Sequence, residues 1–169
     1  MSDKIKPGTK TKIDAQQILK EILKNIVLAP NSRRLFVIGL TGLPGCGKSF
    51  LAKQLGEELH LPILSNDQIR RDFNRLGLPG SSPHQELLQE IAETRTEILL
   101  ENKVSNIIDA DLYMFYEEAK TRSERYGGEV LMRRINAEEK TMLERIEARK
   151  KEASTLSQAD ADTYFQRKE

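Results

Sequence analysis

The chain has 169 residues, of which 31% are charged, and a formal net charge of +1 at pH 7. This length predicts one domain with its own core, and the near-neutral balance argues against a nucleic-acid or membrane partner selected by overall charge. The single cysteine, Cys46, excludes a disulfide framework. With no apolar signal segment and no bilayer-spanning run in the sequence, we expect a cytoplasmic protein without membrane contact.

The first 30 residues precede all recognisable motifs. Residues 1–13 are polar and lysine-rich, which predicts a flexible tail. Residues 14–30 carry apolar side chains at helical spacing, so we expect a helix that Asp14 caps and Pro30 ends. Packing of this helix against the sheet is favoured over partner docking. Residues 31–169 would then form the main domain.

The glycine-rich stretch from Gly42 to Ser49 reads GLPGCGKS and fits the pattern G-x-x-x-x-G-K-[ST]. An apolar run predicted as a strand leads into it, and a predicted helix over 48–60 follows, which is the setting in which this pattern binds phosphate. Its glycines let backbone N–H groups surround an anion, and the helix adds its positive end. Lys48 would reach the β- and γ-phosphates, and the Ser49 hydroxyl would bind Mg²⁺. The residues expected at the nucleotide are Gly42, Pro44, Gly45, Cys46, Gly47, Lys48, Ser49 and Phe50.

ATP is the expected nucleotide, because no Asn-Lys-x-Asp sequence that would read guanine is present. Cys46 would lie at a helix N-terminus, which lowers a thiol pKa. A small filler at a variable motif position is the favoured interpretation. No group of cysteines and histidines has metal-ligand spacing, which excludes a site of that kind.

Asp67 follows a predicted strand over 61–65 and lies at the start of a predicted helix over 66–76. Ligands of parallel sheets bind beyond the carboxyl ends of the strands, so Asp67 is expected near the γ-phosphate, on the acceptor side. There it could accept the proton of an attacking hydroxyl, with Arg70 facing the same pocket. From position alone, an aspartate that only stabilises the start of a helix is an equal alternative.

The remaining predicted elements alternate between helix and strand. They are a loop over 77–82, a helix over 82–101, a strand over 104–109, a helix over 113–126, a strand over 129–135, a helix over 136–150 and another helix near Ser157. Such alternation predicts a three-layer α/β P-loop NTPase fold, with a parallel sheet of four or five strands and helices on both faces. The N-terminal helix and a helical lid would be additions to this core.

Asp109 ends the third predicted strand, where a Walker-B-like carboxylate is expected. It could hold Mg²⁺ through water or orient the acceptor. Asp111 lies two residues later, and position alone leaves open which of the two carboxylates faces the site. The rival interpretation is a strand-end aspartate that caps the next helix, and it suits Asp111 better.

Arg145 and Arg149 lie four residues apart on one face of a strongly charged predicted helix. A mobile helix with such arginines could close over the triphosphate and neutralise charge in the transition state. On composition alone, a solvated face with ion pairs between neighbouring turns is favoured instead.

Taken in order from Leu35 to the end of the chain, these segments resemble the small P-loop kinases, a group that includes polynucleotide 5′-hydroxyl kinases, zeta toxins and related ATP-binding kinases. The segment LSNDQIR over 64–70 is similar to the strand-then-Asp-x-x-Arg element of that group. This resemblance implies that Asp67 is the general base and that Arg70 contacts the acceptor or a phosphate. The segment IIDA over 107–110 is similar to the third-strand element.

The C-terminal part of the chain extends the resemblance. RIEAR over 145–149 looks like the lid arginines, and SQAD over 157–160 is similar to the Ser-x-Ala element that follows the lid. A lid over about 136–160 is therefore implied. Together with Lys48, the implied catalytic residues are Asp67, Arg70, Arg145 and Arg149, and the implied metal-binding residues are Ser49 and Asp109.

Two departures from the family pattern matter. Family members often carry an arginine early in the helix after the third strand, whereas residues 115–118 read FYEE here. Acceptor recognition is therefore expected to differ. Many relatives also add a last strand beyond the point that corresponds to Glu169.

The sequence thus predicts a Mg²⁺-dependent kinase that transfers the γ-phosphate of ATP to a hydroxyl of a small molecule or of a nucleic-acid end. No long basic stripe supports the nucleic-acid end. The alternatives are an ATP-binding regulatory or interaction module with little or no transfer, and a zeta toxin-like sugar-nucleotide kinase. We expect the loop over 77–83 and the helix after it to select the acceptor, whose identity the pattern leaves open together with the oligomeric state.

Overall fold

The computed structural model describes residues 34–75 and 85–151. Within these ranges the chain forms a parallel sheet of four strands in the order β2-β3-β1-β4. The strands are β1 (Leu35–Thr41), β2 (Ile63–Ser65), β3 (Asn106–Asp109) and β4 (Gly128–Arg134). The expected α/β class and parallel sheet are confirmed. The expected helix over 14–30, the loop over 77–82 and the helix near Ser157 lie outside the described residues.

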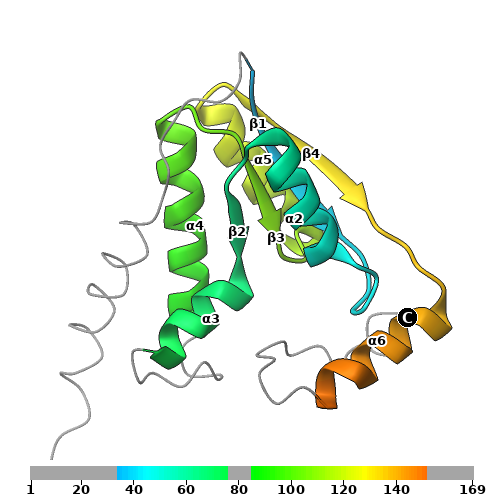
Figure 1. Cartoon of the computed structure of the whole chain (residues 1–169). Coiled ribbons are helices and arrows are strands. Elements are labelled where there is room, and N and C mark those ends of the chain that lie inside the picture. Colours follow the sequence, from blue (N-terminus) through cyan, green and yellow to red (C-terminus); the bar gives the residue numbers. More distant parts are fainter. Residues whose placement is uncertain (1–33, 76–84, 152–169) are drawn as a thin grey trace, which may run out of the picture.

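Five α-helices and one short 3₁₀ helix are described between the strands and after the last one (Figure 1). They are α2 (Lys48–Leu59), α3 (Asn66–Arg75), α4 (Gln85–Glu101), η2 (Tyr113–Phe115), α5 (Tyr116–Arg125) and α6 (Glu139–Lys151). None of the helices in the described part of the chain is both long and apolar enough to cross a membrane.

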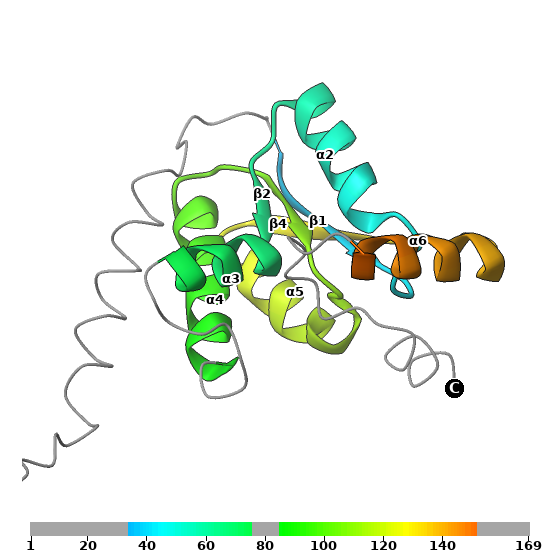
Figure 2. The ribbon, with the colours of Figure 1, turned by 60° about the horizontal axis from the view of Figure 1, so that its bottom comes forward.

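The central strand β1 explains why the sheet is covered on both faces. Its apolar run pairs with β3 on one side and β4 on the other, and its alternate side chains point to opposite faces. Ile38 and Leu40 pack against Ala52 of α2. Leu35 and Val37 pack against Leu100 of α4. Accordingly α2 covers one face, while α4 and α5 cover the other (Figure 2).

Helix α3 rests on α4 rather than directly on the middle of the sheet. Its Ile69 and Phe73 pack with Leu88 and Ile91 of α4 in one buried cluster. Because α3 begins directly after β2, this packing fixes the first turn of α3 at the carboxyl edge of the sheet.

Helix α6 begins later than the sequence predicted. The backbone N–H of Ile135 still donates to the carbonyl of Thr41, at 2.8 Å, so the extended chain continues past the last residue of β4. The helix therefore starts at Glu139 instead of Asn136. This extension carries α6 to the glycine-rich loop, where Met142 and Ile146 bury Cys46.

Candidate active site

A cleft of about 410 Å³ lies at the carboxyl ends of the strands, between the glycine-rich loop on one side and α3 and α4 on the other. It gathers side chains from segments that are far apart in sequence. Most of the expected site residues line it, namely Pro44, Gly45, Gly47, Lys48, Ser49, Asp67, Arg70, Asp109 and Arg149.

The glycine-rich loop has the backbone that the motif requires. Gly42, Gly45 and Gly47 have φ angles of 145°, 80° and 107°, in the region that L side chains rarely adopt. Gly47 immediately precedes α2, so the loop and the positive end of that helix face the same space. The Lys48 ammonium donates to the carbonyls of Gly42 and Leu43, at 2.7 and 3.2 Å. The loop therefore places the Lys48 ammonium and a tightly turned, glycine-rich backbone beside the cleft.

Three of the residues expected at the nucleotide lie outside the walls of this cleft. Gly42 takes part through its carbonyl, which accepts from Lys48. The Cys46 side chain is buried, 4% exposed, among Met142 and Ile146, and its sulfur accepts from the Lys48 ammonium at 3.8 Å. Phe50 is 69% exposed on the outer side of α2.

Ser49 and Asp109 meet across the sheet edge. The Ser49 hydroxyl donates to Asp109 Oδ1 at 3.1 Å. Burial raises the pKa of the Asp109 carboxyl, and the charge of Asp67 raises it further, while the bond from Ser49 and the charge of Lys48 oppose the shift. A nearby cation would favour the ionised form of this carboxyl group and so lower its pKa.

Asp111 has a different partner. Its Oδ1 accepts from the Thr41 hydroxyl at 2.8 Å and from the backbone N–H of Tyr113 at 3.4 Å. Both Asp109 and Asp111 line the cleft, but Asp109 is the one bonded to the serine of the motif. Asp111 makes its contact to Tyr113 from the position before the N-cap of η2, which is Leu112.

The residues described here include no group of three or more His, Cys, Asp or Glu side chains that could hold a metal ion. Mg²⁺ in nucleotide sites is held by one or two protein oxygens together with phosphates and water. The oxygen pair of Ser49 and Asp109 fits that donor set.

Asp67 and Arg70 form an ion pair on the first turn of α3. Arg70 NH1 lies 2.6 Å from Asp67 Oδ1, and the Arg70 side chain is 14% exposed. The spacing of three residues places both groups on one helix face, which is turned to the cleft. The arginine thus orients the carboxylate and compensates its charge.

The two predicted lid arginines have separate positions. Arg145 NH1 donates to the carbonyl of Gly45 at 3.1 Å, so this side chain ties α6 to the loop. Arg149 lines the cleft itself. The expected shared helix is present, but Arg149 is the member of the pair that faces the cleft.

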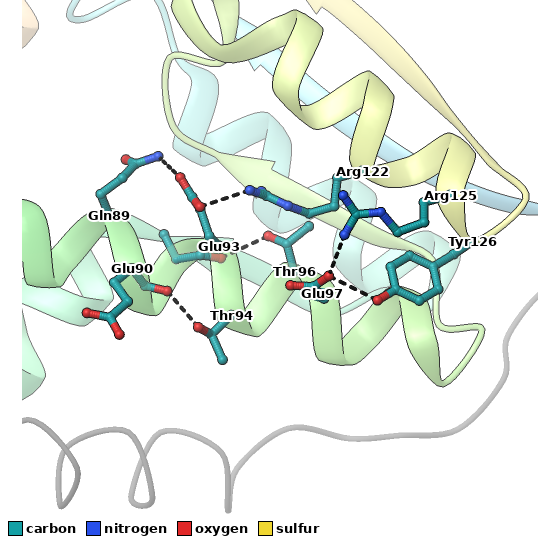
Figure 3. Close-up of polar contacts among 10 residues, drawn as sticks. Gln89, Glu90, Glu93, Thr94, Thr96, Glu97, Arg122, Arg125 and Tyr126 are labelled. Atoms are coloured by element: carbon teal, nitrogen blue, oxygen red, sulfur yellow. Dashed lines mark hydrogen bonds and ion pairs between the residues drawn. The ribbon is translucent and has the colours of Figure 1, made fainter.

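Helices α4 and α5 add charged groups that sequence reasoning missed. Figure 3 shows Arg122 of α5 directed at Glu93 of α4, with 2.9 Å between NH2 and Oε2. The other oxygen of Glu93 accepts from Gln89 at 2.7 Å. One turn further along α4, Glu97 accepts from Arg125 and from the Tyr126 hydroxyl.

Arg95 of α4 also lines the cleft, and two of its side-chain nitrogens are buried without a hydrogen-bond partner. Burial lowers the pKa of its guanidinium, and the charge of Asp72 opposes that shift. Neither Arg95 nor Arg122 belongs to a motif. Only the helical spacing of Gln89, Glu93 and Thr96 could have indicated that these residues share the face of α4 that lines the cleft.

Comparisons with known proteins agree with this geometry. Residues 37–168 match the family model described as an AAA domain. A UPF0200 protein of Aeropyrum pernix is 30% identical over 130 residues, which cover 71% of this chain and 68% of that protein.

Two solved structures have the same fold. A candidate kinase from Chloroflexus aurantiacus superposes with a TM-score of 0.61 at 21% identity, covering 78% of this chain and 74% of that one. A protein of the PezAT chromosomal toxin–antitoxin system of Streptococcus pneumoniae gives a TM-score of 0.71 at 16% identity. In that case 83% of this chain and 63% of the other chain are covered. Because the family model spans most of the chain, the chain belongs to the AAA-domain family.

Proposed function

We propose that the protein transfers the γ-phosphate of ATP to a hydroxyl group of an acceptor, in a Mg²⁺-dependent reaction. The observation that carries this proposal is that one cleft joins the P-loop lysine, the Ser49–Asp109 oxygen pair and the Asp67–Arg70 pair. A nucleotide switch needs the first two of these. The third is what a hydroxyl acceptor requires, because its proton must leave during transfer.

On the donor side, the loop N–H groups and Lys48 would bind the β- and γ-phosphates. Ser49 and Asp109 would hold Mg²⁺, which when bound would neutralise charge on the phosphates. Because the transition state of phosphoryl transfer is loose, positioning and charge compensation supply most of the acceleration. Arg149 would add positive charge from the lid side.

On the acceptor side, Asp67 would accept the hydroxyl proton as the acceptor oxygen bonds to the γ-phosphorus. The bond between that phosphorus and the bridging oxygen of ATP breaks, and ADP leaves with its electron pair. Arg70 holds the Asp67 carboxylate in place through their 2.6 Å contact.

The proposal is tested by incubating the purified protein with Mg²⁺, γ-labelled ATP and a pool of hydroxyl metabolites and oligonucleotide ends. Mass spectrometry would then identify any product that has gained one phosphoryl group. Lys48→Ala should abolish this product. Lys53→Ala is the matched control, because Lys53 is an exposed lysine of the same helix. Tight Mg–ATP binding with no phosphorylated product would favour the regulatory module instead.

A further inference from the structure

Two arginines on the acceptor side of the cleft differ in how their charge is compensated. Arg122 is paired with Glu93, and both oxygens of that carboxylate are in use. Arg95 lies on the same helix as Glu93 and lines the same cleft, yet its Nε and NH1 atoms are buried without an acceptor. A buried cation without a hydrogen-bonded partner lowers stability unless a ligand supplies one.

The carboxylate whose charge acts on Arg95, that of Asp72, also contacts other residues. Asp72 acts on Arg95 through its charge, but its Oδ1 accepts from Gln68 at 3.4 Å and lies 3.7 Å from Arg75 NH2. The other carboxylate of α3, Asp67, is bonded to Arg70. Arg70 itself has a buried Nε without a partner. Arg70 and Arg95, which both line this wall of the cleft, therefore have buried side-chain nitrogens for which no hydrogen-bond acceptor is described.

Arg95 belongs to a different helix from those that flank the P-loop. Helix α4 packs on α3 and β2 at one edge of the sheet, whereas α2 and α6 flank the P-loop across the cleft (Figures 1 and 2). The expected general base, Asp67, lies on α3 beside α4. A molecule that presents its hydroxyl to Asp67 would thus extend toward α4.

From this arrangement we infer that the acceptor carries an oxyanion, a phosphate or carboxylate group, that Arg95 binds while the hydroxyl of the same molecule faces Asp67. A planar guanidinium matches such a group with two parallel hydrogen bonds. That the bound molecule is the acceptor of a phosphoryl group rests on the proposed function, but the oxyanion site itself is testable by binding alone.

The binding test uses protein saturated with Mg²⁺ and a non-hydrolysable ATP analogue, so that the P-loop is filled. Calorimetry then measures inorganic phosphate, glycerol 3-phosphate and glycerate, with glycerol as the neutral counterpart. We expect the anionic probes to bind about tenfold or more tightly than glycerol, the scale of one charge-assisted hydrogen bond. Preference for glycerol 3-phosphate identifies a phosphate ester, and preference for glycerate identifies a carboxylate.

Two substitutions locate the site. Arg95→Met should remove the preference for anions, and Arg95→Lys should restore part of it. Arg71→Met is the control, because it removes the same charge from an exposed residue of α3 that bonds only to Gln68 among the contacts described. Equal preference for anions in wild-type protein and Arg95→Met, or no preference in wild-type protein, would overturn the inference.

A thermal melt of the nucleotide-free protein excludes a merely structural role. Because the buried nitrogens of the Arg95 side chain lack partners, the Arg95→Met protein should melt at the wild-type temperature or above it. A lower melting temperature together with unchanged binding of anions would mark Arg95 as structural and contradict the inference.

Transfer assays separate the two proposals. If anions bind through Arg95 but no acceptor is phosphorylated, the oxyanion site stands and the kinase proposal fails. If neutral hydroxyl compounds are phosphorylated equally well by wild-type protein and Arg95→Met, the kinase proposal stands and this inference fails.

Discussion

The Ser49 hydroxyl at the start of α2 donates to the Asp109 carboxylate at the end of β3, with 3.1 Å between Oγ and Oδ1. This contact joins Ser49, the residue after the P-loop lysine, to β3, the strand that pairs with β1. It brings two oxygen groups suited to Mg²⁺ to the wall of one cleft. The site therefore depends on how β1 and β3 pair as well as on the loop itself.

Asp109→Asn should raise the melting temperature of the Mg²⁺-free protein at neutral pH. The pKa of Asp109 is raised in the fold, chiefly by burial. Because the folded pKa of this aspartate is higher than its unfolded pKa, the free energy of unfolding falls as pH rises from the unfolded pKa through the folded pKa. The ionised form of Asp109 is therefore destabilising at pH 7. Calorimetry at pH 7 and near pH 4 measures the effect, and the gain should be larger at pH 7.

The same variant should lose the extra stabilisation that Mg²⁺ adds to ATP. Binding to the native state raises stability in proportion to the logarithm of ligand concentration over Kd. Wild-type protein should melt at a higher temperature with Mg–ATP than with ATP and EDTA, whereas the two temperatures should coincide for Asp109→Asn. An equal Mg²⁺ effect in both proteins would remove Asp109 from the metal site.

Gly45→Ala should both destabilise the protein and impair nucleotide binding. A Cβ there would lie 2.5 Å from the carbonyl oxygen of Met142, and the φ of 80° is unfavourable for alanine. We expect a loss of about 2–3 kcal/mol, which is the scale of backbone strain plus a steric clash. Chemical denaturation and ATP titration measure the two effects.

Gly127→Ala is the matched control for that substitution. Gly127 has a similar φ of 75°, but a Cβ there meets nothing within 4 Å. Its cost should be limited to about 1–2 kcal/mol for the left-handed conformation, with unchanged ATP affinity. If both variants bind ATP equally well, the contact of α6 with the loop has no bearing on the nucleotide.

Arg149→Gln should lower kcat more than it raises the Kd for ATP. This side chain lines the cleft from α6, where it would act on charge that develops during transfer. Arginines in that role contribute about 10³–10⁵ in kcat, so a loss of at least about tenfold is expected here. Lys140→Gln on the exposed face of α6 should leave kcat unchanged. Equal rates for the two variants would contradict a role for Arg149 in the transition state.

The parts of the site that follow from local rules were predictable from the chain alone. The P-loop is recognised from its glycines, its lysine and the flanking strand and helix. The pair of Asp67 and Arg70 is recognised from helical spacing. Asp109 and Asp111 were indistinguishable by position, because residues two apart on an extended chain share a face. Their partners, Ser49 and Thr41, come from other elements, so only the fold separates them.

The acceptor side of the cleft was not predictable in the same way. Which face of α4 meets the cleft depends on how α3 and α5 pack against that helix, and Arg95 belongs to no motif. The predicted start of α6 was wrong for a related reason. Asn136 has the chemistry of a helix cap, but the bond from Ile135 to Thr41 keeps the chain extended there.

In the proposed reaction, Asp67 is the base for phosphoryl transfer in this cleft. The most direct measurement compares the ATP affinity and the rate of acceptor phosphorylation of Asp67→Asn with those of wild-type protein. We expect the Kd for Mg–ATP to change less than about threefold and transfer to fall by about 10²–10⁴, the range of general-base catalysis. Undiminished transfer by Asp67→Asn would contradict the role of Asp67 as the base.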